Sequence, residues 1–308
     1  MDLPSFFDES SADQLFLPRY DLIAREARAA GLAPASSDAI KIGVFAIDMQ
    51  VGFCHPQGTL FVPGALDDTV RACRFIYRNI DRITNLYFSL DTHRAYQIFH
   101  PLFWADPRGN HPPALTVITQ KDIDDGRWTP TRFRDEAIDY VKQLDARGGK
   151  YSLCIWPFHT MLGSLDHALM PILFECALYH TIGRQNQCSF EAKGEHPLTE
   201  NFSVLSPEVK EVAGTKVGQF NTGLLNALME NDRIYILGEA SSHCVKETIT
   251  DIQKVLSPAL LKKIYLLQDC MSPVPAIPGV DFPAIAALAL EGFKSAGMNL
   301  ASSTDPIV

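Results

Sequence analysis

The sequence predicts an α/β protein built around a mainly parallel β-sheet with helices on both faces. Segments with strand-like and helix-like spacing of apolar residues alternate over most of the chain, which is typical of right-handed βαβ units. The run Ile42-Gly43-Val44-Phe45-Ala46-Ile47 is almost continuously apolar, as expected for a central parallel strand covered on both faces. With 308 residues, of which 46% are hydrophobic, the chain can also bury a large core.

The individual elements are predicted from branched and aromatic residues in strands and from apolar residues at helical intervals in helices. The predicted order is strand 42–49, helix 67–79, strand 85–90, helix 165–180, strand 189–192, helix 222–229, strand 233–237, helix 245–255, strand 263–268 and helix 282–295.

We expect an N-terminal extension over residues 1–38, with an amphipathic stretch at Leu22–Ala30, and a single domain over residues 39–308. Two stretches interrupt the alternation, at residues 101–150 and 194–219. Long loops in a compact domain usually serve function, so we expect these two to cover the site.

Composition narrows the function classes. A net charge of -9 without a basic stripe argues against nucleic acid as a partner. There is no apolar stretch of about 20 residues and no secretory leader, so we expect no membrane association and a cytoplasmic location. Seven cysteines without a CxxC pair are neither a disulfide framework nor a zinc ribbon, and we expect reduced thiols.

Cys244 is the first candidate catalytic residue, because it lies between a predicted buried strand and a predicted helix. Free N–H groups and the positive end of the helix dipole favour a thiolate there and can hold an oxyanion. Asp48 follows a central strand, where it can take a thiol proton, and Lys193 ends another strand, where it can support the thiolate. The alternatives are an inert buried thiol, a loop-capping Asp and a surface Lys.

A second group of residues suggests a metal site. Asp91-Thr92-His93 follows a predicted strand, His100 lies seven residues beyond, and His159 occurs in Trp156-Pro157-Phe158-His159. Carboxylate and imidazole ligands suit a divalent metal such as zinc, manganese or iron. The alternative is a set of solvated loop histidines.

Taken in order, these motifs resemble those of the isochorismatase-like cysteine hydrolases, and most closely those of the nicotinamidases and pyrazinamidases. The matching motifs are Asp48-Met49-Gln50 with Phe53, Asp91-Thr92-His93, Trp156-Pro157-Phe158-His159, Lys193-Gly194 and Gly238-Glu239-Ala240 with Cys244-Val245. The resemblance covers residues 41–303. It implies a three-layer α/β/α sandwich around a parallel six-stranded sheet.

The resemblance also implies roles for these residues. Asp48, Lys193 and Cys244 would form the catalytic triad, and a cis peptide at Glu239–Ala240 would place the N–H groups of Ala240 and Cys244 as an oxyanion hole. The implied metal ligands are Asp91, His93 and His159, with His100 as a further candidate. The residues implied to contact substrate are Gln50, Phe53 and Trp156.

The implied reaction is hydrolysis of the C–N bond of a small carboxamide, such as nicotinamide, through a thioester on Cys244, in a homo-oligomer. Three alternatives stay open. The substrate could be another small amide or carbamoyl compound, or an isochorismate-like ether, although Cys244 argues against the ether. The protein could also be a catalytically silent relative that binds a ligand.

Two departures from the nicotinamidase pattern bear on the substrate. The segment Thr160-Met161-Leu162-Gly163 stands where nicotinamidases commonly have Cys-Val after the histidine. Glu239 replaces a small apolar residue, and we expect its carboxyl group to contact the substrate or to raise the pKa of the thiol.

Overall fold

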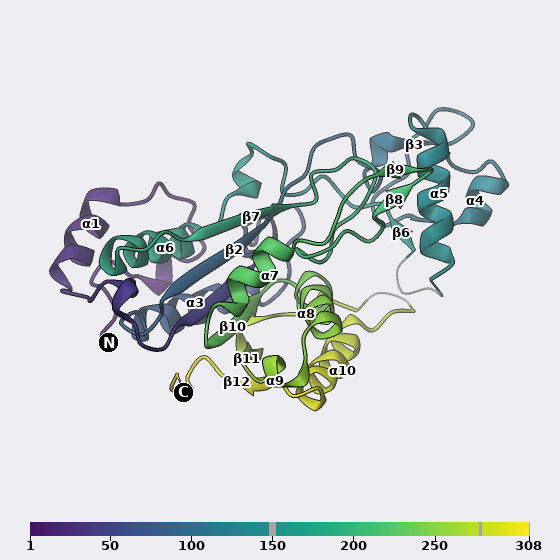
Figure 1. The fold of residues 1–308 in the computed structure, drawn as a ribbon. Helices are drawn as coiled ribbons and strands as arrows, with labels where there is room; N and C mark the ends of the chain where they lie inside the picture. Colours follow the sequence, from purple (N-terminus) through teal and green to yellow (C-terminus); the bar gives the residue numbers. More distant parts are fainter. Residues whose placement is uncertain (148–151, 277–278, 308) are drawn as a thin grey trace.

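The fold is centred on a parallel six-stranded sheet, as predicted. The computed structural model describes residues 1–147, 152–276 and 279–307, and its sheet has the order β12-β11-β10-β1-β2-β7 (Figure 1). All neighbouring strands of this sheet run parallel. The strands are β1 (Ile42–Ile47), β2 (Asn85–Asp91), β7 (Ser189–Lys193), β10 (Arg233–Gly238), β11 (Ile264–Leu267) and β12 (Asn299–Ala301).

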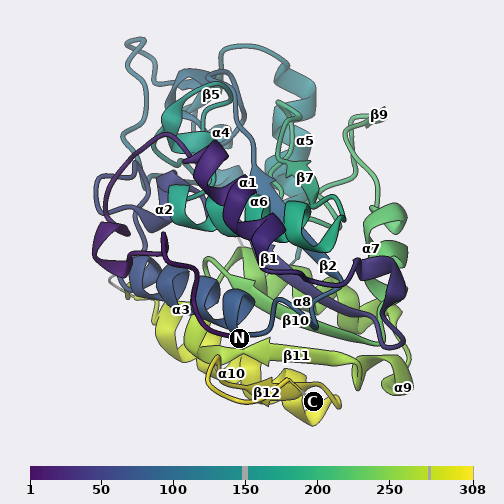
Figure 2. The ribbon, with the colours of Figure 1, turned by 90° about the vertical axis from the view of Figure 1, so that its left-hand side faces the viewer.

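Helices cover both faces of this sheet, which makes three layers (Figures 1 and 2). One face carries α1 (Tyr20–Ala29), α3 (Ala65–Arg78) and α6 (Pro171–Arg184), and the other carries α7 (Thr222–Met229), α8 (Cys244–Val255) and α10 (Phe282–Ser295). Two short helices are α2 (Val51–Cys54) and α9 (Pro258–Leu261). No helix in the described ranges combines the length and the apolar character needed to cross a bilayer.

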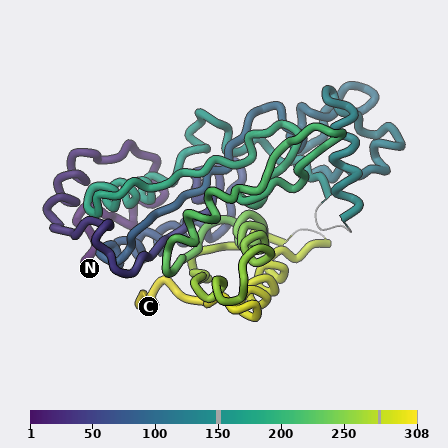
Figure 3. Tube along the Cα trace, viewed as in Figure 1, coloured from purple at the N-terminus to yellow at the C-terminus, as the bar shows by residue number. Residues whose placement is uncertain are grey.

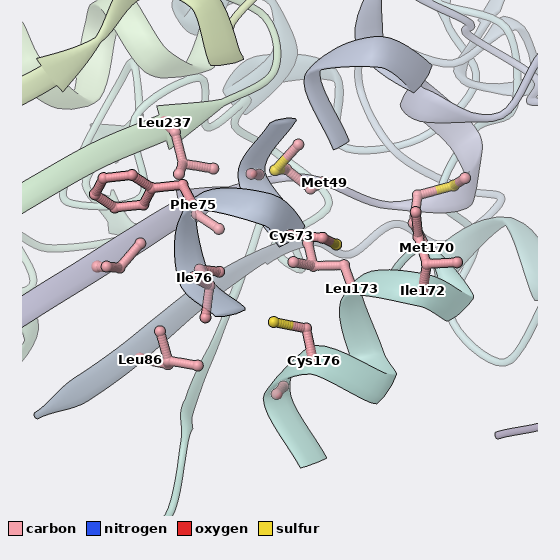
Figure 4. Close-up of a cluster of buried hydrophobic side chains, with 14 of the residues drawn as sticks. Met49, Cys73, Phe75, Ile76, Leu86, Met170, Ile172, Leu173, Cys176 and Leu237 are labelled. Atoms are coloured by element: carbon pink, nitrogen blue, oxygen red, sulfur yellow. The ribbon is translucent and has the colours of Figure 1, made fainter. Parts of the chain in front are cut away.

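Alternate residues of β1 supply the two cores on either side of the sheet. Val44 and Ala46 belong to the core shared with α1, α3 and α6, whereas Phe45 and Ile47 belong to the core shared with α7, α8 and α10. Figure 4 shows the first of these cores, where side chains of α3 and α6 meet over the sheet. Burial on both faces explains why β1 is apolar at nearly every position.

Most predicted elements agree with the structure to within two residues. The largest difference is at α6, which was predicted to begin at Leu165 and begins at Pro171. Residues Leu165–His167 form a separate 3-10 turn, and Pro171 occupies the first turn of the helix, where its missing N–H costs nothing. The short strand β12 was not predicted, because three residues carry too little periodicity.

The two interruptions of the alternation build a lobe beyond the carboxyl ends of the strands (Figures 1 and 3). We use the term lobe for residues 96–147, 152–156 and 198–217. The prediction of long loops was wrong for part of it, because the lobe contains α4 (Gln120–Asp124), the twelve-residue α5 (Arg134–Asp145) and the short strands β3 (Trp104–Ala105), β4 (Val117–Ile118), β5 (Thr129–Pro130), β6 (Leu153–Cys154), β8 (Glu211–Val212) and β9 (Thr215–Lys216).

The lobe has a hydrophobic core of its own. Tyr140 and Leu144 of α5 pack there with Trp104, Val212 and other apolar residues from both interruptions. Three pairs of two-residue antiparallel strands, β3–β5, β4–β6 and β8–β9, connect its segments by hydrogen bonds. The segments that seemed to be loops therefore fold together into one packed unit.

Candidate active site

Four candidate residues meet because four neighbouring strands end at the same edge of the sheet. Asp48 directly follows β1, Asp91 ends β2, Lys193 ends β7 and Cys244 begins α8 beyond β10. The strand register places Asp91 opposite Lys193 and Ile47 opposite Gly238. The carboxyl edge of a parallel sheet is where open α/β proteins bind their ligands.

Lys193 is at the centre of this group. Its Nζ lies 3.0 Å from Asp48 Oδ2 and 2.7 Å from Asp91 Oδ1. It also donates to the carbonyl oxygen of Asn201 at 2.9 Å and lies 3.6 Å from the Sγ of Cys244. Burial lowers the pKa of Lys193, but the charges of Asp48 and Asp91 outweigh burial and hold its pKa well above its usual range. The side chain is therefore a fixed positive charge beside the thiol.

The expectation that Cys244 has a low pKa is wrong for the free site. Burial raises the pKa of the thiol well above its usual value, and the Asp48 and Asp91 charges oppose the lowering effect of Lys193. Burial raises the pKa of Asp48 as well, although Lys193 and a hydrogen bond from Ser89 Oγ at 2.6 Å act against it. Burial therefore opposes ionisation of both the Asp48 carboxyl and the Cys244 thiol, and the charge of Lys193 favours it.

The turn before Cys244 has the predicted cis peptide bond between Glu239 and Ala240. Gly238 enters this turn with a φ of 124°, and a Cβ atom there would lie 2.1 Å from the backbone oxygen of Ile47. Only glycine, which has no Cβ atom, fits this position. In the turn, the N–H groups of Ser241 and Val245 donate to backbone oxygens, whereas those of Ala240 and Cys244 make no such bond among the described residues. Both residues line the cavity described below, so two backbone donors are left at the turn that carries the thiol.

Asp91, His93 and His159 form a compact group of potential metal ligands. Their ligand atoms all lie within 4.8 Å of one another, and all three residues are buried. His93 Nδ1 donates to the carbonyl oxygen of Gly194 at 3.1 Å, and His159 Nδ1 donates to that of Pro157 at 2.8 Å. These carbonyls leave both Nε2 atoms facing Asp91 Oδ2, at 2.8 and 3.6 Å. Backbone carbonyls commonly orient metal-binding histidines in this way.

His100 lies beside this group without joining it. Its ring centroid is 5.8 Å from that of His93 and 5.9 Å from that of His159. Nδ1 donates to the carbonyl oxygen of Arg94 at 3.0 Å, whereas the buried Nε2 has no hydrogen-bond partner among the described residues. Burial and the two neighbouring histidines lower the pKa of His100 to about 3, so its ring is neutral. A neutral imidazole with a free Nε2 suits metal binding.

A cavity of about 80 Å³ opens onto Cys244 between the sheet edge and the lobe. Phe53 and Trp156, both predicted to wall the substrate, line it, and further apolar walls come from Phe61, Val62 and Phe202. The ring of Phe53 stands edge-on to His159 with centroids 5.8 Å apart. The cavity thus has an apolar, aromatic lining between the thiol and the histidines, as suits a flat, uncharged ligand.

Gln50 is not on the cavity wall, which corrects its predicted contact with substrate. Its Nε2 donates to the carbonyl oxygens of Asp91 and His167 at 2.9 and 2.8 Å, and its Oε1 accepts from the N–H of Asp91 at 2.7 Å. Both amide hydrogens are used and the side chain is fully buried, so Gln50 has no donor left for a ligand. Gln50 instead fixes the backbone of Asp91.

Glu200 is a wall residue that the sequence analysis missed. It lines the cavity, and its Oε1 accepts a hydrogen bond from Trp156 Nε1 at 2.5 Å. Its backbone N–H donates to the hydroxyl of Tyr140 at 3.2 Å, which connects it to α5 of the lobe. Burial raises the pKa of Glu200 well above its usual range. No motif marked this residue, because its contacts come from segments far apart in the sequence.

Comparison with solved structures identifies the same architecture in nicotinamidases. The yeast nicotinamidase matches with a TM-score of 0.55 and 15% identity over 85% of this chain and 99% of the yeast chain. A nicotinamidase/pyrazinamidase of Acinetobacter baumannii matches with a TM-score of 0.53 and 20% identity over 86% of this chain and 97% of the other. The chain shares their fold. This confirms the predicted three-layer α/β fold around a parallel six-stranded sheet. A scan against protein-family models and a search of curated proteins find no match.

Proposed function

We propose that this protein is a cysteine amidohydrolase that cleaves the C–N bond of a small carboxamide, with nicotinamide as the first candidate substrate. The observation that carries the proposal is the position of Lys193 Nζ, 3.0 Å from Asp48 and 3.6 Å from the Sγ of Cys244 at the wall of an apolar cavity. A base, a fixed cation and a thiol in contact are the parts that nucleophilic catalysis on an amide needs. Structural similarity to nicotinamidases supports the choice of substrate.

In the first half of the reaction, Asp48 takes the thiol proton as Cys244 Sγ attacks the amide carbonyl carbon. The N–H groups of Ala240 and Cys244 are the donors available to the resulting oxyanion. Asp48 then returns the proton to the leaving nitrogen, the C–N bond breaks, and ammonia departs from a thioester on Cys244. The raised pKa of Asp48 suits both roles, because the group must accept a proton and give it back.

In the second half, a water molecule gives a proton to Asp48 and its oxygen attacks the thioester carbonyl. The C–S bond breaks, the sulfur recovers the proton, and the carboxylic acid is released. The positive charge of Lys193 stabilises the thiolate each time it forms.

Asp91, His93 and His159 fit a divalent metal such as zinc, manganese or iron, and the free Nε2 of His100 lies beside them. A bound metal would supply a Lewis acid for an acceptor atom on the substrate ring. Within the chain itself, Gln50 and the carbonyl oxygens of Gly194 and Pro157 hold these side chains in place.

The test is ammonia release from nicotinamide and from a panel of other small amides by the purified protein. We expect Cys244→Ala to lose at least about a thousandfold in kcat, as expected when the nucleophile of a triad is removed. Cys154→Ala is the matched control, since its Sγ lies outside the cavity lining. Activity on another amide alone would keep the mechanism and change the substrate, and full activity of Cys244→Ala would end the proposal.

A further inference from the structure

Glu239 is the buried titratable group that the proposed mechanism leaves without a role. It follows β10, is 1% exposed and reaches the cavity wall beside Cys244. Its Oε2 accepts a hydrogen bond from the N–H of Ser272 at 3.2 Å. Its Oε1 is buried and has no hydrogen-bond partner among the described residues. Such an atom calls for an explanation, because an unpaired buried oxygen is costly.

The residue opposite is Asp68 of α3. Asp68 is 2% exposed, forms an ion pair with Arg71, and its Oδ2 accepts from Ser272 Oγ at 2.5 Å. Ser272 therefore connects the two carboxyl groups, because it donates its N–H to Glu239 and its hydroxyl to Asp68. Of the two carboxyl groups, Asp68 is the one that forms an ion pair with Arg71.

Two buried carboxyl groups in contact cannot both be ionised. Burial and the neighbouring charge of Asp68 raise the pKa of Glu239 well above its usual range. The positive charge of Arg71 lowers the pKa of Glu239, but burial and Asp68 outweigh it. A protonated Glu239 can donate from Oε1 to Asp68, which accounts for the atom that otherwise lacks a partner.

Residues 272–274 also bind the turn that carries the Cys244 thiol. The N–H of Ser241 donates to the carbonyl oxygen of Ser272 at 2.9 Å, and the N–H of Val274 donates to Ser242 Oγ at 3.0 Å. Glu239 thus adds a side-chain bond to the backbone bonds between residues 238–244 and residues 272–274. Through Asp68, Glu239 also links the turn to helix α3.

We propose that Glu239 is a positioning residue, which fixes the cis-peptide turn and its N–H donors by sharing one proton with Asp68. The proposal deepens the function proposed above, because it assigns the departure from the nicotinamidase pattern at Glu239 to the same site. The expectation that Glu239 raises the pKa of the Cys244 thiol is thereby replaced. Burial and the charges of Asp48 and Asp91 are what raise that pKa.

The experiment compares three variants of the full chain. Glu239→Gln keeps an acceptor for the Ser272 N–H and a donor for Asp68, so we expect kcat within about threefold of the wild type. Glu239→Leu loses both bonds, so we expect kcat to fall by about tenfold or more while KM changes little, since the oxyanion forms only after substrate binds. Glu200→Gln changes a second buried carboxyl group that lines the cavity and serves as the comparison variant, for which we expect any effect in KM.

Two further measurements do not depend on amide turnover. Infrared difference spectra at neutral pH should show that Glu239→Gln removes the carbonyl band of one protonated carboxylic acid, distinct from the band that Glu200→Gln removes. Hydrogen exchange read by mass spectrometry should show faster exchange over residues 238–247 in Glu239→Leu and unchanged exchange in Glu239→Gln.

The outcomes separate the two proposals. A wild type without amide hydrolysis would defeat the proposed function, while the spectra and exchange would still decide the role of Glu239. Absence of an acid band from Glu239, or unchanged exchange over residues 238–247 in a folded Glu239→Leu, would overturn the positioning role. If Glu239→Leu does not fold, Asp68→Asn takes its place, and an unshifted Glu239 acid band in that variant would overturn the shared proton.

Discussion

The sheet and the lobe contribute to the candidate site in different ways. The sheet delivers Asp48, Asp91, Lys193 and Cys244 from the ends of four neighbouring strands, and the strand register fixes their spacing. The lobe has shorter strands and a separate core, and it reaches the cavity through wall residues such as Glu200, which is anchored to α5.

The sheet edge therefore supplies the reacting groups, and the lobe contributes to the shape of the cavity wall. Groups at the ends of packed parallel strands are held rigidly, as proton transfer and nucleophilic attack require. A lobe assembled on top of that edge can change the walls of the cavity without moving the thiol. We therefore expect changes at the strand ends to act on kcat and changes in the lobe to act on KM.

The largest effect should come from Lys193→Ala. Loss of the ammonium group leaves Asp48 and Asp91 as buried carboxyl groups without a cation, so we expect kcat to fall by at least about a thousandfold and stability to fall by about 3–5 kcal/mol. Ammonia-release kinetics and denaturant unfolding measure both. Lys216→Ala, on the exposed strand β9, is the control. A folded Lys193→Ala enzyme with normal kcat would remove Lys193 from the chemistry.

The next effect should be on metal content. His93→Ala removes a ring whose Nε2 faces Asp91, so we expect affinity for zinc to fall by at least about a hundredfold. Metal analysis after dialysis against zinc buffers measures this without any activity assay. His111→Ala, an exposed histidine whose Nδ1 donates to a backbone carbonyl, should bind as the wild type does. Equal zinc content in both variants would contradict the ligand assignment.

A smaller effect should appear at the wall of the cavity. Trp156→Phe removes the N–H that donates to Glu200 and leaves this buried carboxyl group without that bond. We expect KM to rise by about tenfold and kcat to stay within about threefold, which corresponds to roughly 1–2 kcal/mol of lost binding. Trp128→Phe, a lobe tryptophan that does not line the cavity, is the control. A loss confined to kcat would place Trp156 with the chemistry and break the division between sheet and lobe.

The smallest effect concerns the pH dependence of stability. Because the pKa of Glu239 is raised in the folded protein, its contribution to stability is complete below the unfolded value of about 4.3 and is lost as the pH rises toward the folded value. Glu239→Gln lacks this loss. We expect the unfolding temperature of the wild type to fall, relative to that of Glu239→Gln, by a few degrees across this window. A constant difference between the two proteins would mean that Glu239 has the same pKa folded and unfolded.

Local sequence was sufficient for the sheet and its edge. The strand and helix periods and the apolar run of β1 predicted the architecture, and the residues directly after the strands supplied the candidates Asp48, Lys193 and Cys244. The resemblance to nicotinamidases then predicted that these candidates form one site. These inferences succeeded because parallel strands place their carboxyl ends together, so position in the chain translates directly into position in space.

Other features were decided by tertiary contacts alone. The low pKa expected for Cys244 from its helix position was wrong because burial outweighs Lys193, and burial is a property of the whole fold. Gln50 lies in a matching motif yet is committed to the backbone of Asp91. The lobe and Glu200 escaped prediction because their contacts join segments far apart in the chain.

Local periodicity and the geometry of parallel strands were thus enough to predict the α/β sheet and the candidate side chains at its edge. The charges of those groups, their access to the cavity and the shape that the lobe gives to its wall depend on the three-dimensional fold. Desolvation and long-range hydrogen bonds govern these properties, and neither is encoded by the spacing of residues along the chain.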